Sequence, residues 1–103
     1  PRGRAGDDFP PLVFVARGDK GERPDKVLLL LDHGADINAT NSIGKTALHY
    51  AAVAGHDRVV TTLLGRGADT ALVDSEGRTA LSLARAAGKV ATCELLAVHG
   101  AMA

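Results

Sequence analysis

The residues that could carry out chemistry are spread along the whole chain. They are four histidines, one cysteine, a Gly-Lys-Thr triplet at 44–46, and the turn carboxylates Asp36, Asp69, Asp74 and Glu76. Histidine and cysteine are zinc ligands, and a Ser/His/Asp or Cys/His set would indicate nucleophilic catalysis. A glycine-rich loop that contains a lysine could hold a phosphate. Each of these functions requires a particular spacing.

The Gly-Lys-Thr triplet lacks the spacing of a phosphate-binding loop. Such a loop needs a glycine five residues before Gly44, and Ala39 stands there instead. No Ser/His/Asp or Cys/His set converges in the pattern, so we expect no catalytic centre. The carboxylates are expected to cap turns and to be solvated. Cys93 is expected to be a small core residue.

The strongest pattern is an internal repeat centred on residues 44–56. A shift of ~33 residues brings Gly44 onto Gly77 and Leu63 onto Leu96. Helices as short as these are marginal alone, so they must be held by packing on their neighbours. The chain is therefore predicted to be a tandem array.

Each unit of the array is predicted to contain two short helices, with prolines near helix starts and glycines after helix ends. Thr46 and Thr79 are expected to cap helices through their side-chain oxygens, and Asp57 to cap the helix that follows it. The first predicted helix starts at Pro10–Pro11 and buries Leu12, Val15 and Ala16. The second, third, fifth and sixth are predicted at 24–33, 47–54, 80–87 and 90–99. The fourth follows Asp57 and buries Val59, Val60, Leu63 and Leu64.

The middle unit resembles an ankyrin repeat. It has the Thr-Pro-Leu-His-x-Ala core of that family, with Ala47 in place of the proline. The third unit keeps Gly-Arg-Thr-Ala-Leu at 77–81 but has Ser82 where the histidine would stand. The first unit has Pro-Pro-Leu-Val at 10–13 in place of the signature. Its turn at 18–24 holds three extra residues, which we interpret as an ordinary length variation.

The resemblance covers residues 9–101 and implies an all-α fold. The expected architecture is an ankyrin-repeat solenoid of stacked helix-turn-helix pairs joined by β-hairpin-like loops. After a flexible segment at 1–8, the repeats are expected at about 9–40, 41–73 and 74–103.

The histidines are expected to serve structure. His33 and His99 lie two units apart, too far to share an ion. His33, Arg66 and His99 each precede the glycine that ends a helix. At this position a side-chain donor can bond the unpaired carbonyl groups of the last helical turn. The resemblance implies that His49 ties adjacent hairpin loops together, and His56 is expected to fix the turn between two helices. No metal and no cofactor is expected.

The resemblance implies protein–protein recognition by a rigid scaffold whose hairpin tips and first helices line a concave surface. A peptide or a globular protein would be the partner. Ile43 and Tyr50 are expected to be anchors, and the alternative for both is packing within the stack. The family's contact positions fall on Arg17, Ser42, Ile43, Lys45, Tyr50, Val53, Ala54, Val73, Ser75, Glu76, Arg78, Ala86 and Ala87.

Bulk composition narrows the class of partner. The formal net charge is zero, so no nucleic-acid binding is expected. No apolar run approaches the ~18–20 residues of a membrane span. The lone cysteine favours an intracellular setting, cytoplasmic or nuclear. We expect a monomeric domain of a longer chain. The alternative function is a docking or regulatory arm of a larger enzyme or channel whose activity lies outside this fragment.

Overall fold

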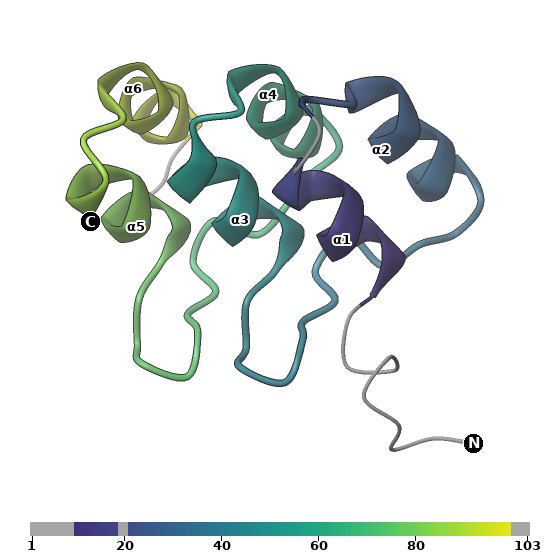
Figure 1. The fold of residues 1–103 in the computed structure, drawn as a ribbon, viewed down its shortest axis with the longest axis horizontal. Coiled ribbons are helices and arrows are strands. Elements are labelled where there is room, and N and C mark those ends of the chain that lie inside the picture. The colour runs from purple at the N-terminus through teal and green to yellow at the C-terminus, as the bar shows by residue number, and fades with distance from the viewer. Residues whose placement is uncertain (1–9, 19–20, 100–103) are drawn as a thin grey trace.

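The computed structural model describes residues 10–18 and 21–99, which form six helices and no strand. Figure 1 shows α1, α3 and α5 side by side in an inner layer, with α2, α4 and α6 in a second, outer layer. The helices are α1 (Pro11–Arg17), α2 (Pro24–Asp32), α3 (Ala47–Ala54), α4 (Asp57–Gly65), α5 (Ala80–Ala86) and α6 (Val90–Val98).

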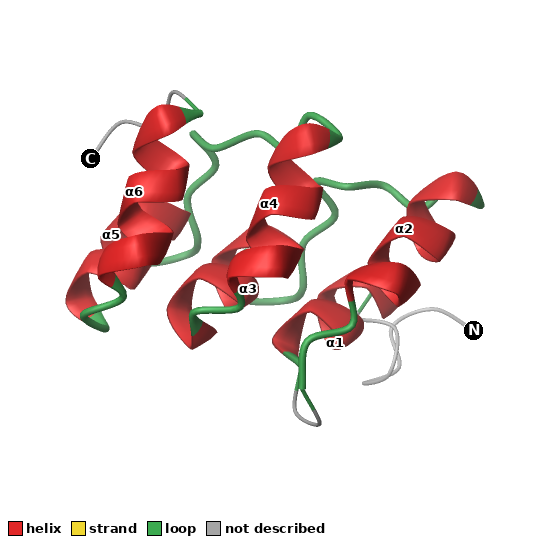
Figure 2. Cartoon of the chain, turned by 90° about the horizontal axis from the view of Figure 1, so that it is seen from above, coloured by secondary structure: helices red, strands yellow, loops and turns green. Residues whose placement is uncertain are grey.

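The helices stack as three pairs, which we call the first, second and third units. Each inner helix packs on the outer helix of its own unit and on the inner helix of an adjacent unit, and each outer helix packs on the outer helix of an adjacent unit. Viewed from above, the pairs lie in one row (Figure 2). The predicted all-α solenoid is therefore confirmed. The segment 1–8, which we predicted to be flexible, lies outside the described residues.

The core is aliphatic and continuous along the row. Leu48, Leu63 and Leu96 are fully buried, and Ala51 and Ala84 let neighbouring helices approach closely. The four residues predicted to be buried in α4 are all buried. In α1, Leu12 and Ala16 are buried as predicted and Val13 is buried as well, whereas Val15 is only half-buried.

Threonine caps begin two of the inner helices, as predicted. The hydroxyl oxygen of Thr46 accepts from the backbone N–H of His49 at 3.2 Å, and that of Thr79 from Ser82 at 3.1 Å. Three helices end one residue earlier than predicted, because His33, Ala87 and His99 are the capping residues rather than the last helical ones.

The prediction that Asp57 caps α4 is wrong, because Asp57 is the first residue of that helix and His56 precedes it. The cap comes from the first unit instead. The carboxylate of Glu22 accepts from the backbone N–H groups of Arg58 at 2.8 Å and Val59 at 3.1 Å. The Asp57 carboxylate accepts a hydrogen bond from the hydroxyl of Thr92 in the third unit. Because Glu22 belongs to the turn at 18–24, this enlarged turn contacts the second unit and is more than a length variation.

Candidate functional site

The two hairpin-like loops are shaped by equivalent side chains, Asn41 and Asp74. The Oδ1 atom of Asn41 accepts from the backbone N–H groups of Ile43 at 3.2 Å and Lys45 at 2.9 Å. In the next loop Oδ1 of Asp74 accepts from two N–H groups in the same relative places, at 2.9 and 3.0 Å. These bonds fix the backbone of each tip. The tips expose Ser42, Ile43, Ser75 and Glu76.

The two tips are also bonded to each other. The N–H of Ser75 donates to the carbonyl of Ile43 at 3.0 Å. Lys45 Nζ lies 2.5 Å from Oδ2 of Asp74, and Nε of Arg78 lies 3.2 Å from the same oxygen. The Asp74 side chain is only 1% exposed. Two residues predicted to contact a partner, Lys45 and Arg78, therefore direct their charge at a buried carboxylate.

Asp74 departs from the expectation that the turn carboxylates are solvated. Burial by itself raises the pKa of Asp74, but the hydrogen bond from Lys45 and the backbone bonds from Arg78 and Glu76 outweigh it. These donors hold the pKa of the carboxyl well below its usual range. Asp36 and Asp69 behave as expected, since each is exposed and accepts a backbone N–H within its own turn.

His49 joins the second unit to the third, as the resemblance implied. Its ring is buried, Nδ1 accepts from the backbone N–H of Thr46 at 3.1 Å, and Nε2 lies 2.9 Å from the carbonyl oxygen of Arg78. These partners require a neutral ring that carries its proton on Nε2. Desolvation by burial lowers the pKa of His49 below its ordinary 6.5, although the bond to Arg78 opposes this.

The other histidines also contact backbone carbonyls. His33 Nδ1 lies 2.9 Å from the oxygen of Leu29, and His99 makes the equivalent bond at 3.0 Å, as expected at helix ends. Arg66 differs, because its guanidinium pairs with Asp32 of the preceding outer helix at 2.7 Å. His56 does more than fix its own turn, since Nε2 bonds the Arg17 carbonyl of the first unit at 3.0 Å.

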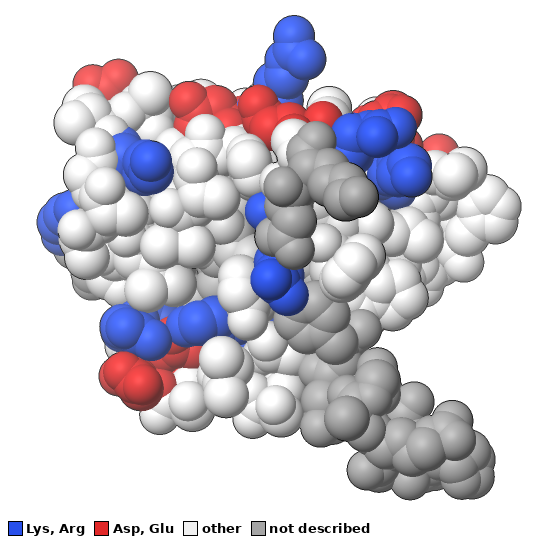
Figure 3. All heavy atoms as spheres, in the orientation of Figure 1, with Lys and Arg blue, Asp and Glu red and all other residues white. Residues whose placement is uncertain are grey.

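Tyr50 lies at the centre of the inner layer and is half-buried. Its hydroxyl accepts from Nδ2 of Asn41 at 2.8 Å, and the guanidinium carbon of Arg17 lies 5.9 Å from the ring centroid. Packing within the stack therefore accounts for part of the role of Tyr50. Figure 3 shows charged side chains along the upper edge, at the left and at the lower left of this face, and some Lys or Arg atoms near its centre, with uncharged side chains between them.

The predicted contact residues fall into two groups by exposure. Arg17, Lys45, Tyr50 and Arg78 are half-buried and bonded internally. The others are exposed, namely Ser42, Ile43, Val53, Ala54, Val73, Ser75, Glu76, Ala86 and Ala87. That these residues meet a partner stays a prediction.

One exposed residue of the inner layer was missed. Phe14 is 60% exposed and follows Leu12 by two residues, as Tyr50 follows Leu48. Counting from these two leucines would have assigned Phe14 to the same surface, but the repeat signature is absent from the first unit.

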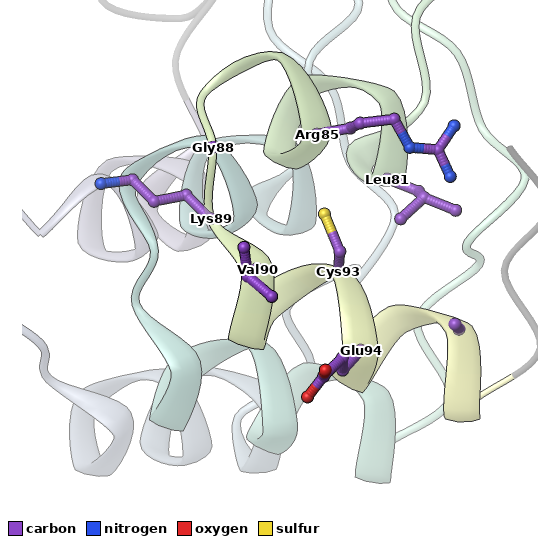
Figure 4. A pocket seen from close by; sticks show the side chains of 8 residues that line it. Leu81, Arg85, Gly88, Lys89, Val90, Cys93 and Glu94 are labelled. Atoms are coloured by element: carbon purple, nitrogen blue, oxygen red, sulfur yellow. The ribbon is translucent and has the colours of Figure 1, made fainter.

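A cavity of about 340 Å³ lies beside α5 and α6 at the end of the row. In Figure 4 the Cys93 side chain extends from α6 toward α5, while Arg85 and Lys89 extend to opposite sides. Cys93 is half-buried, so our prediction of a core residue is only partly right. Val60, its equivalent in the second unit, is fully buried because the third unit covers it. Among the described residues no helix covers Cys93 in this way.

None of the helices that the structure describes is long and apolar enough to cross a membrane.

Comparison with known proteins agrees with this architecture. A family model described as ankyrin repeats in three copies matches residues 12–103. A stretch of 58 residues is 33% identical to the putative ankyrin repeat protein L271 of Acanthamoeba polyphaga mimivirus, covering 55% of this chain and 8% of that protein. A stretch of 61 residues is 39% identical to dynein axonemal heavy chain 12 of Bos taurus, covering 59% of this chain and 16% of that protein.

The matched stretches thus span less than a fifth of the length of these relatives. The family model covers nearly the whole chain, and the three stacked helix pairs are the structure that such repeats form. The chain therefore belongs to the ankyrin repeat family.

Proposed function

We propose that this chain is a protein-binding module that presents a preformed inner surface to a peptide or a globular protein. Ankyrin repeats are generally protein–protein interaction modules. We define the inner surface as the exposed side chains of α1, α3 and α5 together with the loop residues 42–45 and 73–78.

The observation that carries this proposal is the contrast between the polar and the apolar groups of this surface. Every buried side-chain nitrogen or oxygen in the described residues has a hydrogen-bond partner, so these groups serve the fold. Ile43 is 46% exposed, Val53 37% and Val73 52%. These exposed apolar side chains are the groups of this surface whose burial by a partner would contribute most to the free energy of binding.

Rigidity of the surface supports the same conclusion. The tip of each loop is fixed by Asn41 or Asp74, and the two tips are joined through Ile43 and Ser75. A surface that is already ordered loses little conformational entropy when a partner binds. Both a short segment and a folded domain could use such a surface.

Site-specific photo-crosslinking would test the proposal. A photoreactive amino acid is placed at Val53 or Val73 in the intact chain, and the matched control carries it at Val98 in α6, which is 80% exposed. We expect crosslinks to one protein from the first two positions and none from the third. The crosslinked protein is then purified and its binding to the unmodified chain measured. Equal crosslinking from all three positions, or none from the inner surface, would refute the proposal.

The alternative role, a docking or regulatory arm of a larger enzyme or channel, is favoured by one finding. The stretches matched by this chain make up only 8% and 16% of its relatives. Deleting the segment from such a parent protein should change its recruitment or regulation and leave its intrinsic turnover or conductance intact. Loss of turnover in the purified deletion variant would contradict this role.

A further inference from the structure

The cavity beside α5 and α6 repeats a surface that is covered in the second unit. We call it the end cavity, and Cys93 and Ala97 of α6 lie in its wall. Each residue that lines it lies 33 positions after a residue of the second unit. Cys93 thus corresponds to Val60 and Arg85 to Ala52, and both residues of the second unit are fully buried because the third unit packs on them. The end cavity is therefore the equivalent of the surface on which the third unit sits.

The contacts of α6 show how such a surface is filled. The Thr92 hydroxyl donates to the Asp57 carboxylate of α4. Leu96 follows Thr92 by four residues and is fully buried in the same core cluster as Val60. Side chains four residues apart lie on one face of a helix, so this face of α6 covers the second unit. A helix with apolar side chains at the same spacing would fill the end cavity, where Val90 takes the place of Asp57 and offers no acceptor.

The third unit lacks the side chains that would hold a complete fourth unit. His49 of the second unit bonds a backbone carbonyl of the third, whereas its equivalent Ser82 donates its hydroxyl within its own unit. Lys45 pairs with a carboxylate of the third unit, whereas its equivalent Arg78 pairs within its own loop. A fourth unit would therefore find neither of these loop contacts, and a single helix does not need them.

Three charged side chains border the end cavity. Arg85 and Lys89 are cationic and Glu94 is anionic, and none of the three makes an ion pair within residues 10–18 and 21–99. Figure 4 shows Glu94 extending away from α5, whereas Arg85 belongs to α5 and Lys89 extends to the opposite side. The α5 side of the end cavity therefore carries a cation alone, which a carboxylate of a partner complements.

A second copy of this chain is a poor occupant of the end cavity. Head-to-tail stacking would place α2 of that copy on α6, and α2 has Lys26 where α6 has Thr92. The carboxylates of α2, Asp25 and Asp32, lie at positions that are exposed in α6. Such stacking would therefore add a cation to a site that already holds two cations and one anion.

We infer that the end cavity binds one amphipathic helix of a partner protein. The helix packs apolar side chains, spaced i and i+4, on Cys93 and Ala97, and it places a carboxylate beside Arg85. A helix that lays its apolar face in a groove is a common mode of peptide recognition. The end cavity shares only Arg85 with the inner surface, so this inference does not depend on the proposed function.

Selection of helical peptides on the intact chain tests the inference. The library displays a helix with one randomised face, and we expect the enriched peptides to share apolar residues at i and i+4 with an Asp or Glu beside them. Fluorescence anisotropy of labelled peptides then measures their affinity. Cys93 is the only cysteine of the chain, so the rate of its reaction with a maleimide reports on the end cavity. Saturating peptide should slow this reaction about tenfold or more, because the thiol becomes covered.

Two alanines of α6 provide a matched pair of variants. Ala97 lies in the end cavity and Ala91 lies outside it, and both are exposed. Ala97→Glu places a charge in the cavity and should weaken peptide binding about tenfold or more, whereas Ala91→Glu should leave the affinity unchanged. Arg85→Ala should weaken binding about tenfold, and Val73→Ser on the inner surface should leave it unchanged. Thermal unfolding checks that every variant is folded.

A selection that enriches no helical peptide, or peptides that leave the reaction rate of Cys93 unchanged, would overturn the inference. Equal effects of Ala97→Glu and Ala91→Glu would also overturn it. Tighter binding to Arg85→Ala, which restores the alanine of the second unit, would show that the cavity accepts an ankyrin-like helix pair instead. The crosslinking experiment on the inner surface tests the proposed function separately.

Discussion

The Lys45 ammonium lies 2.5 Å from the Asp74 carboxylate, although 29 positions separate the two residues in the chain. The carboxylate is almost wholly buried between the hairpin-like loops of the second and third units, where it also accepts from the Arg78 guanidinium. A buried carboxylate that loses its partners is costly, so this pair makes the stacking of the two loops specific.

Two substitutions of Asp74 should reduce the free energy of unfolding by different amounts. Asp74→Ala removes the ion pair and the bonds that shape the tip, and should reduce the free energy of unfolding by about 3 kcal/mol. Asp74→Asn keeps the tip, because Asn41 shapes the preceding loop in the same way, and should cost about 1.5 kcal/mol. Urea denaturation measures both. Equal losses in the two variants would contradict the division into tip and ion-pair contributions.

Stability should fall in two steps as the pH is lowered. The folded-state pKa of His49 lies below its ordinary 6.5, so the unfolded state binds the extra proton first and the free energy of unfolding decreases below about pH 6.5. The slope is at most about 1.4 kcal/mol per pH unit for one group. The pKa of Asp74 is lowered from its ordinary 3.8 in the folded state. Its protonation therefore causes a second decrease in the free energy of unfolding, which begins below about pH 3.8. Urea denaturation at a series of pH values measures both steps.

Two variants assign these steps to their residues. His49→Gln should be less stable at pH 7 but should lack the decrease that begins near pH 6.5. Asp74→Asn should keep that first decrease and lose the contribution of residue 74 to the second. A stability profile of His49→Gln that runs parallel to that of the parent chain would show that another group causes the first step.

Gly44→Ala should be more damaging than Gly77→Ala. Both glycines lie in the left-handed region, with φ of 78° and 77°, so alanine is strained at either position, by about 1 kcal/mol. At Gly44 an added Cβ would also lie 3.0 Å from the backbone nitrogen of Ser75, whereas at Gly77 nothing lies within 4 Å. We expect a loss of about 2 kcal/mol or more at Gly44, measured by thermal unfolding. A larger loss at Gly77 would contradict this account.

Glu22→Gln should loosen the junction between the first two units. It weakens the acceptor for the N–H groups of Arg58 and Val59, and loss of a helix cap typically costs ~1 kcal/mol. Amide hydrogen exchange should quicken at residues 58 and 59 and remain unchanged in α6. Glu94→Gln, on the exposed side of α6, is the matched control. Unchanged exchange at both amides would show that Glu22 does not cap α4 in solution.

The repeat pattern was sufficient to predict the fold and most helix limits. Short helices of Ala, Leu and Val can bury enough surface only by stacking, and glycines at a fixed period mark where each helix ends. The caps at Thr46 and Thr79 followed from the same pattern, and the bridging role of His49 followed from the resemblance to ankyrin repeats. Each of these features depends on residues that are close in sequence or in equivalent positions of the repeat.

Apart from three helix ends that were predicted one residue too late, the predictions that failed concern contacts between units. Glu22 reaches α4 from 36 residues away, through a turn that has no equivalent in the other units. Nearby sequence does not indicate that Asp74 is buried or that Asp57 bonds Thr92. Both features depend on the distance between adjacent units. Phe14 was missed for a related reason, since the first unit lacks the motif that would have placed it in register.

The contacts that join the units also fix their order. If a gene rearrangement exchanged the second and third units, Ser82 would take the place of His49. Arg78 would take the place of Lys45 and would face Asn41 in the following unit, where Lys45 now meets the Asp74 carboxylate. The three units therefore share one pattern but are not interchangeable. Shuffled versions of this gene should encode proteins that fold poorly, even though every module would retain its own helices.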